Sequence, residues 1–429
     1  GHGVLVRPGE LDAACRRMAV WIVELVARLE RDMRTPRQDA AIRSVLPERA
    51  TARAAYEWAL RAGERLTALR ILSAVPLMPT AQRYAQLQEL QHEVPDVPEK
   101  VLAQVLLTLA NLAFETGRAE ESVELTAAAA EAFAALGDVR LRAWARCFEA
   151  MARWTVDAQR TQVAAILDET LAVFDELHDE LGLAYTLWPA SLLASDTATA
   201  RARADRSETL FRKLGAPFGL GHCLEGRALI ELAAGEPSTS CALLDEALTI
   251  FSDMDNAGCT AHSLEAAAAV LTQRDDLFDA GRLVGAAAEL RSQGGQGHRP
   301  WEREGLARTE QAFADAPASV DLDRARSEGR LLTLSDAVGL GRSLLARATN
   351  GAEVPAPDAE DRLGLSPREG NVLRLLAEGC SNQEISERLF VSVKTVERHL
   401  GNLYRKLDVT NRTQAAAYAI RHGVGTATS

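Results

Sequence analysis

Apolar residues recur at helical spacing along most of this chain, and between positions 101 and 291 the helices themselves recur in similar pairs. Each unit closes with a Phe-x-x-Leu or Phe-x-x-Met marker followed by a break rich in Gly, Asp or Pro. The marker phenylalanines follow one another at nearly equal intervals: Phe133, Phe174, Phe211 and Phe251. A second break divides each unit into two helices. Helix pairs that repeat about every 40 residues predict an α-solenoid, in which a pair buries its apolar face only against its neighbours.

The flanking segments are also predicted to be helical. Residues 10–34 form an amphipathic pattern, with one apolar face made of Leu11, Ala14, Met18, Trp21, Leu25 and Leu29. A glycine-rich break at 292–300 precedes three shorter helices, at 301–314, about 319–328 and 335–348. With 5% aromatic residues and much alanine and leucine, the composition favours helices over strands. The expected fold class is all-α throughout.

The C-terminal stretch from Leu365 onward carries the clearest helix signals in the chain. Ser366-Pro367-Arg368-Glu369 and Ser381-Asn382-Gln383-Glu384 are capping boxes, and Gly379 between them suits a helix stop. Ser392 is placed to cap a third helix, and Asn411-Arg412-Thr413-Gln414 a fourth. These signals predict four short helices, the third spanning residues 393–407.

The third helix has two contrasting faces. One narrow apolar stripe recurs at i, i+4, i+7 and i+11: Val396, Leu400, Leu403 and Leu407. The opposite face consists of Lys394, Arg398, Gly401 and Arg405, flanked by Thr395, Glu397 and Asn402. Cations and amides on a helix that follows a tight turn can donate to base edges and phosphates, so this pattern predicts a DNA-binding helix-turn-helix. A solvated basic face on a small helical bundle is the alternative interpretation.

Several short motifs in this stretch resemble the LuxR/NarL-type helix-turn-helix. They are Leu-Ser-Pro-Arg-Glu at 365–369, Val-Leu-Arg-Leu-Leu-Ala-Glu-Gly at 372–379, Ser-Asn-Gln-Glu-Ile at 381–385, Lys-Thr-Val-Glu-Arg-His-Leu at 394–400, Arg-Lys-Leu at 405–407 and Asn-Arg-Thr-Gln-Ala at 411–415. The resemblance implies a four-helix domain whose third helix reads the groove. It also implies that the fourth helix often pairs two copies on a two-fold operator.

From the helix faces and this resemblance we assign two sets of candidate contacts to double-stranded DNA. The expected base-facing residues are Lys394, Glu397, Arg398, Gly401, Asn402 and Arg405. The expected phosphate contacts are Asn382, Ser392, Thr395, His399, Lys406, Asn411 and Arg412. His399 lies toward the edge of the apolar stripe, so it either reaches a phosphate or only packs.

The body of the chain resembles a larger architecture. The repeats look like tetratricopeptide-like repeats of the longer kind, with Leu109-Ala110-Asn111-Leu112-Ala113 as the nearest approach to their pattern. The segments Gly285–Arg291, Ala325–Arg330 and Leu334–Val338 resemble large regulators in which a STAND-class nucleotide-binding module precedes helical repeats and a LuxR-type tail. The resulting division is 10–98 N-terminal helices, 99–292 repeats, 293–348 further helices, 349–361 linker and 362–429 helix-turn-helix domain.

Charge and cysteine usage add little that is specific. Residues 362–424 carry ten Lys and Arg against six Asp and Glu, while the whole chain has a net charge of −12. A basic tail on an acidic body suits DNA binding by the tail alone. The six cysteines are widely spaced, which is typical of core residues in a protein from a reducing compartment. No run of 18 apolar residues is found, so no membrane span is predicted. A cytoplasmic location is expected.

No enzyme motif is found. The chain has four lysines, none after a G-x-x-x-x-G, so a phosphate-binding P-loop is excluded here. We expect no catalytic residue, no cofactor and no metal. Buried aromatic and histidine side chains of the repeats are expected to pack the core: Trp144, Trp154, Trp188, Phe218, His222 and His262. A concave repeat surface binding a protein or small-molecule effector is the functional alternative.

Two hypotheses follow for the whole chain. In the first, the repeats sense a partner or effector and control a tail that binds DNA as a homodimer. In the second, the chain is a protein-interaction scaffold whose tail only dimerises. Salt-dependent DNA binding by the tail distinguishes them.

Overall fold

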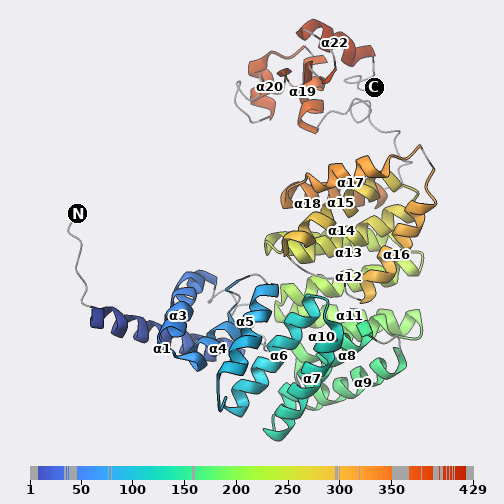
Figure 1. Cartoon of the computed structure of the whole chain (residues 1–429). Helices are drawn as coiled ribbons and strands as arrows, with labels where there is room; N and C mark the ends of the chain where they lie inside the picture. The colour runs from blue at the N-terminus through green and yellow to red at the C-terminus, as the bar shows by residue number, and fades with distance from the viewer. Residues whose placement is uncertain are drawn as a thin grey trace. The chain divides into compact units, whose positions relative to one another are not determined.

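The computed structural model describes residues 8–32, 35, 37, 46–75, 77–78, 80–156, 160–294, 298, 300–317, 319–349, 367–377, 379–389, 396, 400–401, 403–404, 406–407, 409 and 411–421. The chain divides into two compact units, Gly1–Asn350 and Gly351–Ser429. Every regular element among the described residues is a helix, which confirms the all-α prediction (Figure 1). Within those residues no helix is long and apolar enough to cross a bilayer.

The first unit begins with a small helical layer. Its elements are α1 (Pro8–Asp32), the 3-10 turn η1 (Leu46–Glu48), α3 (Arg49–Arg61), α4 (Arg65–Ala74) and α5 (Thr80–Glu93). The buried face of α1 is Ala19, Ile22, Leu25, Val26 and Leu29. The predicted face was therefore partly wrong, since Trp21 is 41% exposed. Apolar residues occupy more than one side of this helix, so periodicity alone could not select the side that packs.

The helices that follow form the repeats. They are α6 (Glu99–Glu115), α7 (Ala119–Ala135), α8 (Val139–Val156), α9 (Arg160–Glu176), α10 (Glu180–Leu192), α11 (Thr197–Leu214), α12 (Pro217–Ala233), α13 (Pro237–Asp253), α14 (Ala257–Gln273) and α15 (Leu277–Gly294). From α6 to α14 each packs against its predecessor and its successor in the chain, and α15 packs against α14 and α17 (Leu322–Arg330). The predicted helix pairs are confirmed, and consecutive helices stack as in a helical-repeat protein (Figure 1).

The Phe-x-x-Leu marker is a helix-stop motif. The carbonyl of each marker phenylalanine accepts a hydrogen bond from the amide five positions later, for example from Asp138 to Phe133 at 2.9 Å and from Asp179 to Phe174 at 2.9 Å. The residue before each donor has a positive φ: Gly137, His178, Gly215 and Asp255. This is the Schellman arrangement, which satisfies carbonyls that the helix end leaves without partners.

The same phenylalanines fix the spacing between successive helix pairs. Phe174, Phe211 and Phe251 are fully buried. Where a glycine faces the ring the backbones approach closely. A Cβ on Gly182 would lie 2.4 Å from the Phe174 ring, and one on Gly219 would lie 2.2 Å from Phe211. In both cases the glycine belongs to the start of the next helix, so that helix begins directly against the ring.

Three further helices close the described part of the first unit: α16 (Pro300–Ala314), α17 (Leu322–Arg330) and α18 (Leu334–Thr349). α16 packs on α14, and α18 packs back on α13 and α14. α17 crosses α15 at backbone contact, because a Cβ on Gly285 would lie 2.2 Å from the Arg326 carbonyl oxygen and one on Gly329 would lie 2.0 Å from that of Arg282. The glycines in these two sequence segments therefore serve close helix packing.

The second unit contains α19 (Pro367–Ala377), α20 (Asn382–Leu389) and α22 (Arg412–Arg421), with described residues of the 393–407 segment between them. One apolar core joins these parts. Its buried members are Val372, Leu373, Leu376, Cys380, Ile385, Val396, Leu400, Leu403, Leu407, Ala415 and Ala419. Each of these helices contributes to this core, so the described parts of the second unit share a single apolar interior.

Candidate DNA-binding site

The turn between α19 and α20 is built as the sequence predicts. Gly379 has φ of 84°, and the Cys380 amide donates to the Leu375 carbonyl at 3.0 Å, which ends α19 in a left-handed stop. The Ser381 amide then donates to Glu384 Oε2 at 2.7 Å, while the Glu384 amide donates to Ser381 Oγ at 3.3 Å. These reciprocal bonds confirm the second capping box. The hydrogen bond from the Ser381 amide also lowers the pKa of Glu384 below its usual value.

The apolar stripe of the third segment faces inward. Val396 and Leu403 are fully buried, and Leu400 and Leu407 are 5% and 6% exposed. All four contact the core that α19, α20 and α22 share. Because the four occupy one side of a helix, the opposite side of this segment must point away from that core.

Two predicted contacts of this segment fall within the described residues, Gly401 on the side opposite the stripe and Lys406 at the flank of the stripe. Gly401 and Lys406 are both exposed. Among the described residues, no heavy atom outside the local helix lies within 4 Å of the position a Gly401 Cβ would take, so a surface can approach the backbone there. The other candidates on this segment lie outside the described residues: Ser392, Lys394, Thr395, Glu397, Arg398, His399, Asn402 and Arg405.

The remaining predicted phosphate contacts lie at two helix starts, which the structure brings together. Arg412 Nη1 donates to Asn382 Oδ1 at 3.0 Å, and its Nη2 donates to the Cys380 carbonyl. Asn411 caps α22 by accepting the Gln414 amide at 2.9 Å. Arg412, the first residue of α22, is thus hydrogen-bonded to Asn382, the first residue of α20. Amides at helix starts favour anions such as phosphate, so this arrangement suits the predicted role.

Comparison with known families agrees with this geometry. Residues 363–419 match the family model described as bacterial regulatory proteins, luxR family. The C-terminal unit therefore contains a LuxR-type helix-turn-helix domain.

The relatives in curated collections extend the likeness beyond this domain. "Putative HTH-type transcriptional regulator Rv0890c" of Mycobacterium tuberculosis is 32% identical over 198 residues, which is 46% of this chain but 22% of that protein. "Transcriptional regulatory protein LiaR" of Bacillus subtilis is 41% identical over 102 residues, 24% of this chain and 45% of LiaR. This chain thus matches less than half of the length of either relative. BtubC (BKLC) of P. vanneervenii, a solved structure, is similar at a TM-score of 0.34 and 17% identity, covering 56% of this chain and 92% of that one.

A second group of candidate functional side chains was missed by the sequence analysis, which assigned them to core packing. His222 and His262 are buried as expected, but each lies against a carboxylate: His222 Nδ1 is 2.9 Å from Glu225 Oε2, and His262 Nδ1 is 2.9 Å from Glu302 Oε1. The sequence contained a signal for them. His-x-x-Glu occurs at 222–225 and again at 262–265, in equivalent helices of neighbouring repeats.

Proposed function

We propose that this chain is a sequence-specific, DNA-binding transcription regulator whose third C-terminal helix enters the major groove. The observation that carries the proposal is the burial of Val396, Leu400, Leu403 and Leu407 in the core of the second unit. That burial directs the opposite face of the helix outward. On this face we assign base contacts to Lys394, Glu397, Arg398, Gly401, Asn402 and Arg405.

The phosphate contacts are proposed to flank the inserted helix. Asn382 and Asn411 lie at the starts of α20 and α22, and Lys406 lies on the exposed side of the third segment. Arg412 holds the two helix starts together, so it positions one anion-binding edge as well as adding charge. Backbone phosphate contacts of this kind set the register of the helix on the duplex and supply the salt-dependent part of the affinity.

The helical repeats are proposed to control the DNA-binding unit in response to a protein or small-molecule effector. Two observations support this role: the first unit is far larger than DNA binding requires, and its repeats enclose a buried polar cluster as well as an apolar core. We further propose that two copies pair on a two-fold site. The names of the mycobacterial and Bacillus relatives are consistent with regulation of transcription.

Selection of bound duplexes from a random pool tests the proposal. The full chain should enrich one sequence with two-fold symmetry, and affinity for it should fall steeply with salt. Enrichment of no sequence, or binding that salt leaves unchanged, would favour the scaffold alternative. Repeating the selection with residues 351–429 then tests control by the repeats, because a change in affinity without a change in sequence is expected.

A further inference from the structure

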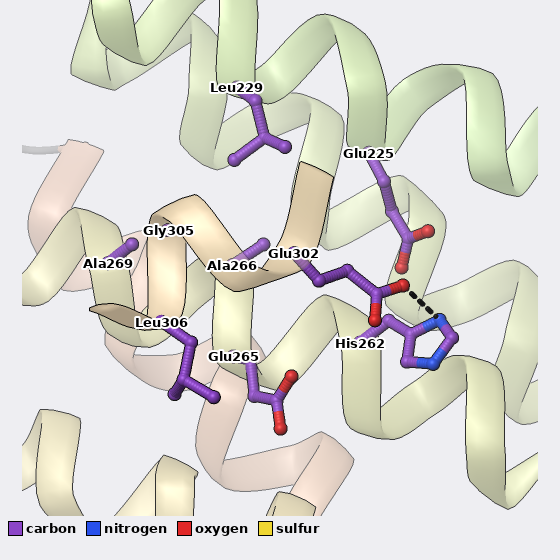
Figure 2. A pocket seen from close by; sticks show the side chains of 9 residues that line it. All are labelled: Glu225, Leu229, His262, Glu265, Ala266, Ala269, Glu302, Gly305 and Leu306. Carbon is purple, nitrogen blue, oxygen red and sulfur yellow. Dashed lines mark ion pairs between the residues drawn. The ribbon is translucent and has the colours of Figure 1, made fainter. Parts of the chain in front are cut away.

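A small cavity in the first unit is lined by acidic side chains. It lies between α12, α14 and α16, and its volume is about 20 Å³. Figure 2 shows the carboxyl groups of Glu225 and Glu302 turned toward the His262 ring. Glu265 also lines the cavity, and Leu229, Ala266, Ala269 and Leu306 supply apolar lining. A cavity of this size holds one water molecule or one ion, and an organic effector does not fit.

Glu225 and His262 line this cavity, and together with His222, which lies against Glu225, they can act as ligands for the same ion. His222, Glu225 and His262 are all buried, and one potential ligand atom from each lies within 4.8 Å of the other two. His222 and Glu225 lie one turn apart on α12, whereas His262 occupies the equivalent place on α14, in the next repeat. Two imidazoles and one carboxylate form a donor set used by proteins for Zn²⁺ sites with an open position.

The candidate ligands are held in place by other side chains. Ser263 Oγ donates to Glu225 Oε1 at 2.5 Å, which fixes the carboxylate from the neighbouring helix. The His222 ring stacks on Trp188, with centroids 5.3 Å apart and planes inclined by 13°. Phe251 contacts the same imidazole at 4.9 Å between centroids. Ligand side chains fixed in this way lose little freedom when an ion binds.

The charges around the cavity also favour a cation. Two buried carboxylates, Glu225 and Glu265, and the half-buried Glu302 lie near one buried guanidinium, Arg291, which bonds to Glu265 and Glu302. Burial raises the pKa of Glu265, but hydrogen bonds from His298 and Arg291 outweigh it and hold that pKa below its usual value. The three carboxylates outnumber this one guanidinium, and a bound cation would reduce the imbalance.

We propose that His222, Glu225 and His262 bind one divalent transition-metal ion of the Zn²⁺ class, with Glu302 of α16 adjacent to its open position. Calcium and magnesium are disfavoured, since both prefer an all-oxygen shell and here two of the three donors are nitrogen. The ion joins two successive repeats and contacts the edge of α16, so its binding stiffens this end of the first unit.

Metal titration of the full chain tests the proposal. The wild-type protein should bind one Zn²⁺ per chain in competition with a chromophoric chelator. His222→Gln and His262→Gln should each weaken binding ~100-fold or more, since even outer-shell changes at zinc sites cost 10–100-fold. Glu231→Gln is the matched control, because Glu231 is a buried carboxylate of the same helix that pairs with Arg201 outside the cavity. Failure to bind Zn²⁺, or equal binding by all four proteins, would overturn the proposal.

Spectroscopy on the wild-type protein removes any dependence on how the variants fold. X-ray absorption of the zinc-loaded full chain should show imidazole nitrogen and carboxylate oxygen around the ion. The Co²⁺ form should show visible ligand-field bands without a thiolate charge-transfer band. Sulfur in the first shell would assign the ion to cysteines and refute this site, since Cys259 Sγ lies 3.5 Å from His222 Nε2 yet is not among the three proposed ligands.

Discussion

Replacing Leu403 with alanine tests whether the apolar side of the third C-terminal helix packs in the core of the second unit. Leu403 is fully buried in the core of the second unit. Truncating a buried leucine to alanine costs about 2–5 kcal/mol, including the cavity that remains. The luxR-family match spans residues 363–419, and at 0.05–0.15 kcal/mol per residue a domain of that size is stable by about 3–9 kcal/mol. We therefore expect this one change to remove a large part of the unit's stability.

Lys406→Ala is the matched comparison on the same helix. Lys406 is exposed, so its removal should change the free energy of unfolding by less than about 0.5 kcal/mol. If Lys406 contacts a phosphate, the slope of log affinity against log salt should fall by about 0.9. The two variants should thus lose DNA binding for different reasons, one through unfolding and the other through charge.

Hydrogen exchange measured by mass spectrometry reports the stability of the second unit separately from that of the first. All six tryptophans precede residue 302, so tryptophan fluorescence follows only the first unit. In Leu403→Ala, exchange of peptides from α19 should accelerate roughly 30-fold or more, while the fluorescence transition stays at its wild-type position. In Lys406→Ala, the exchange of α19 peptides and the fluorescence transition should both match those of the wild type. Unchanged α19 protection in Leu403→Ala would contradict the assigned packing of this helix.

Two further predictions concern helix packing and capping. Gly285→Ala should destabilise the first unit by about 1–3 kcal/mol, because its Cβ would meet the Arg326 carbonyl oxygen at 2.2 Å. Gly339→Ala is the control, since no described atom lies within 4 Å of its Cβ position, and it should stabilise the unit by about 0.5–1 kcal/mol. Parallel thermal melts measure both changes. Glu384→Gln should destabilise the second unit at pH 7. The pKa of Glu384 is lowered by the Ser381 amide, so the difference from wild type should be complete above the ordinary pKa and vanish as pH falls through the lowered value. A pH-independent difference in exchange protection would show that the carboxylate charge is irrelevant to the cap.

Local signals in the sequence account for much of the observed fold. The capping box at Ser381 and Glu384 and the stop at Gly379 act over a single helical turn, so the geometry can be predicted from neighbouring residues alone. The Phe-x-x-Leu marker is equally local, because the Phe133 carbonyl and the Asp138 amide belong to one turn. The stripe ending at Leu407 was predicted for the same reason: helical periodicity places its four members on one side.

Features that depend on distant segments could not be predicted in this way. Glu302 lies beside the buried polar cluster of His222, Glu225 and His262, and it reaches His262 only because α16 packs on α14. Periodicity marks His262 as an inward residue and does not identify its neighbour. The prediction of which side of α1 packs was partly wrong for a related reason. Trp21 and Ile22 are both apolar, and it is the tertiary contacts that bury Ile22 and leave Trp21 exposed.

Binding of the full chain and its Arg398→Ala variant to the selected duplex, and to single-base variants of it, tests the central claim most directly. If Arg398 faces bases, the variant should lose ~1–3 kcal/mol of affinity for the selected site and become indifferent to the base pair at one position, with weak binding to unrelated DNA nearly unchanged. An equal loss of affinity on every duplex, or no loss at all, would contradict a third helix that reads the major groove through its outer face.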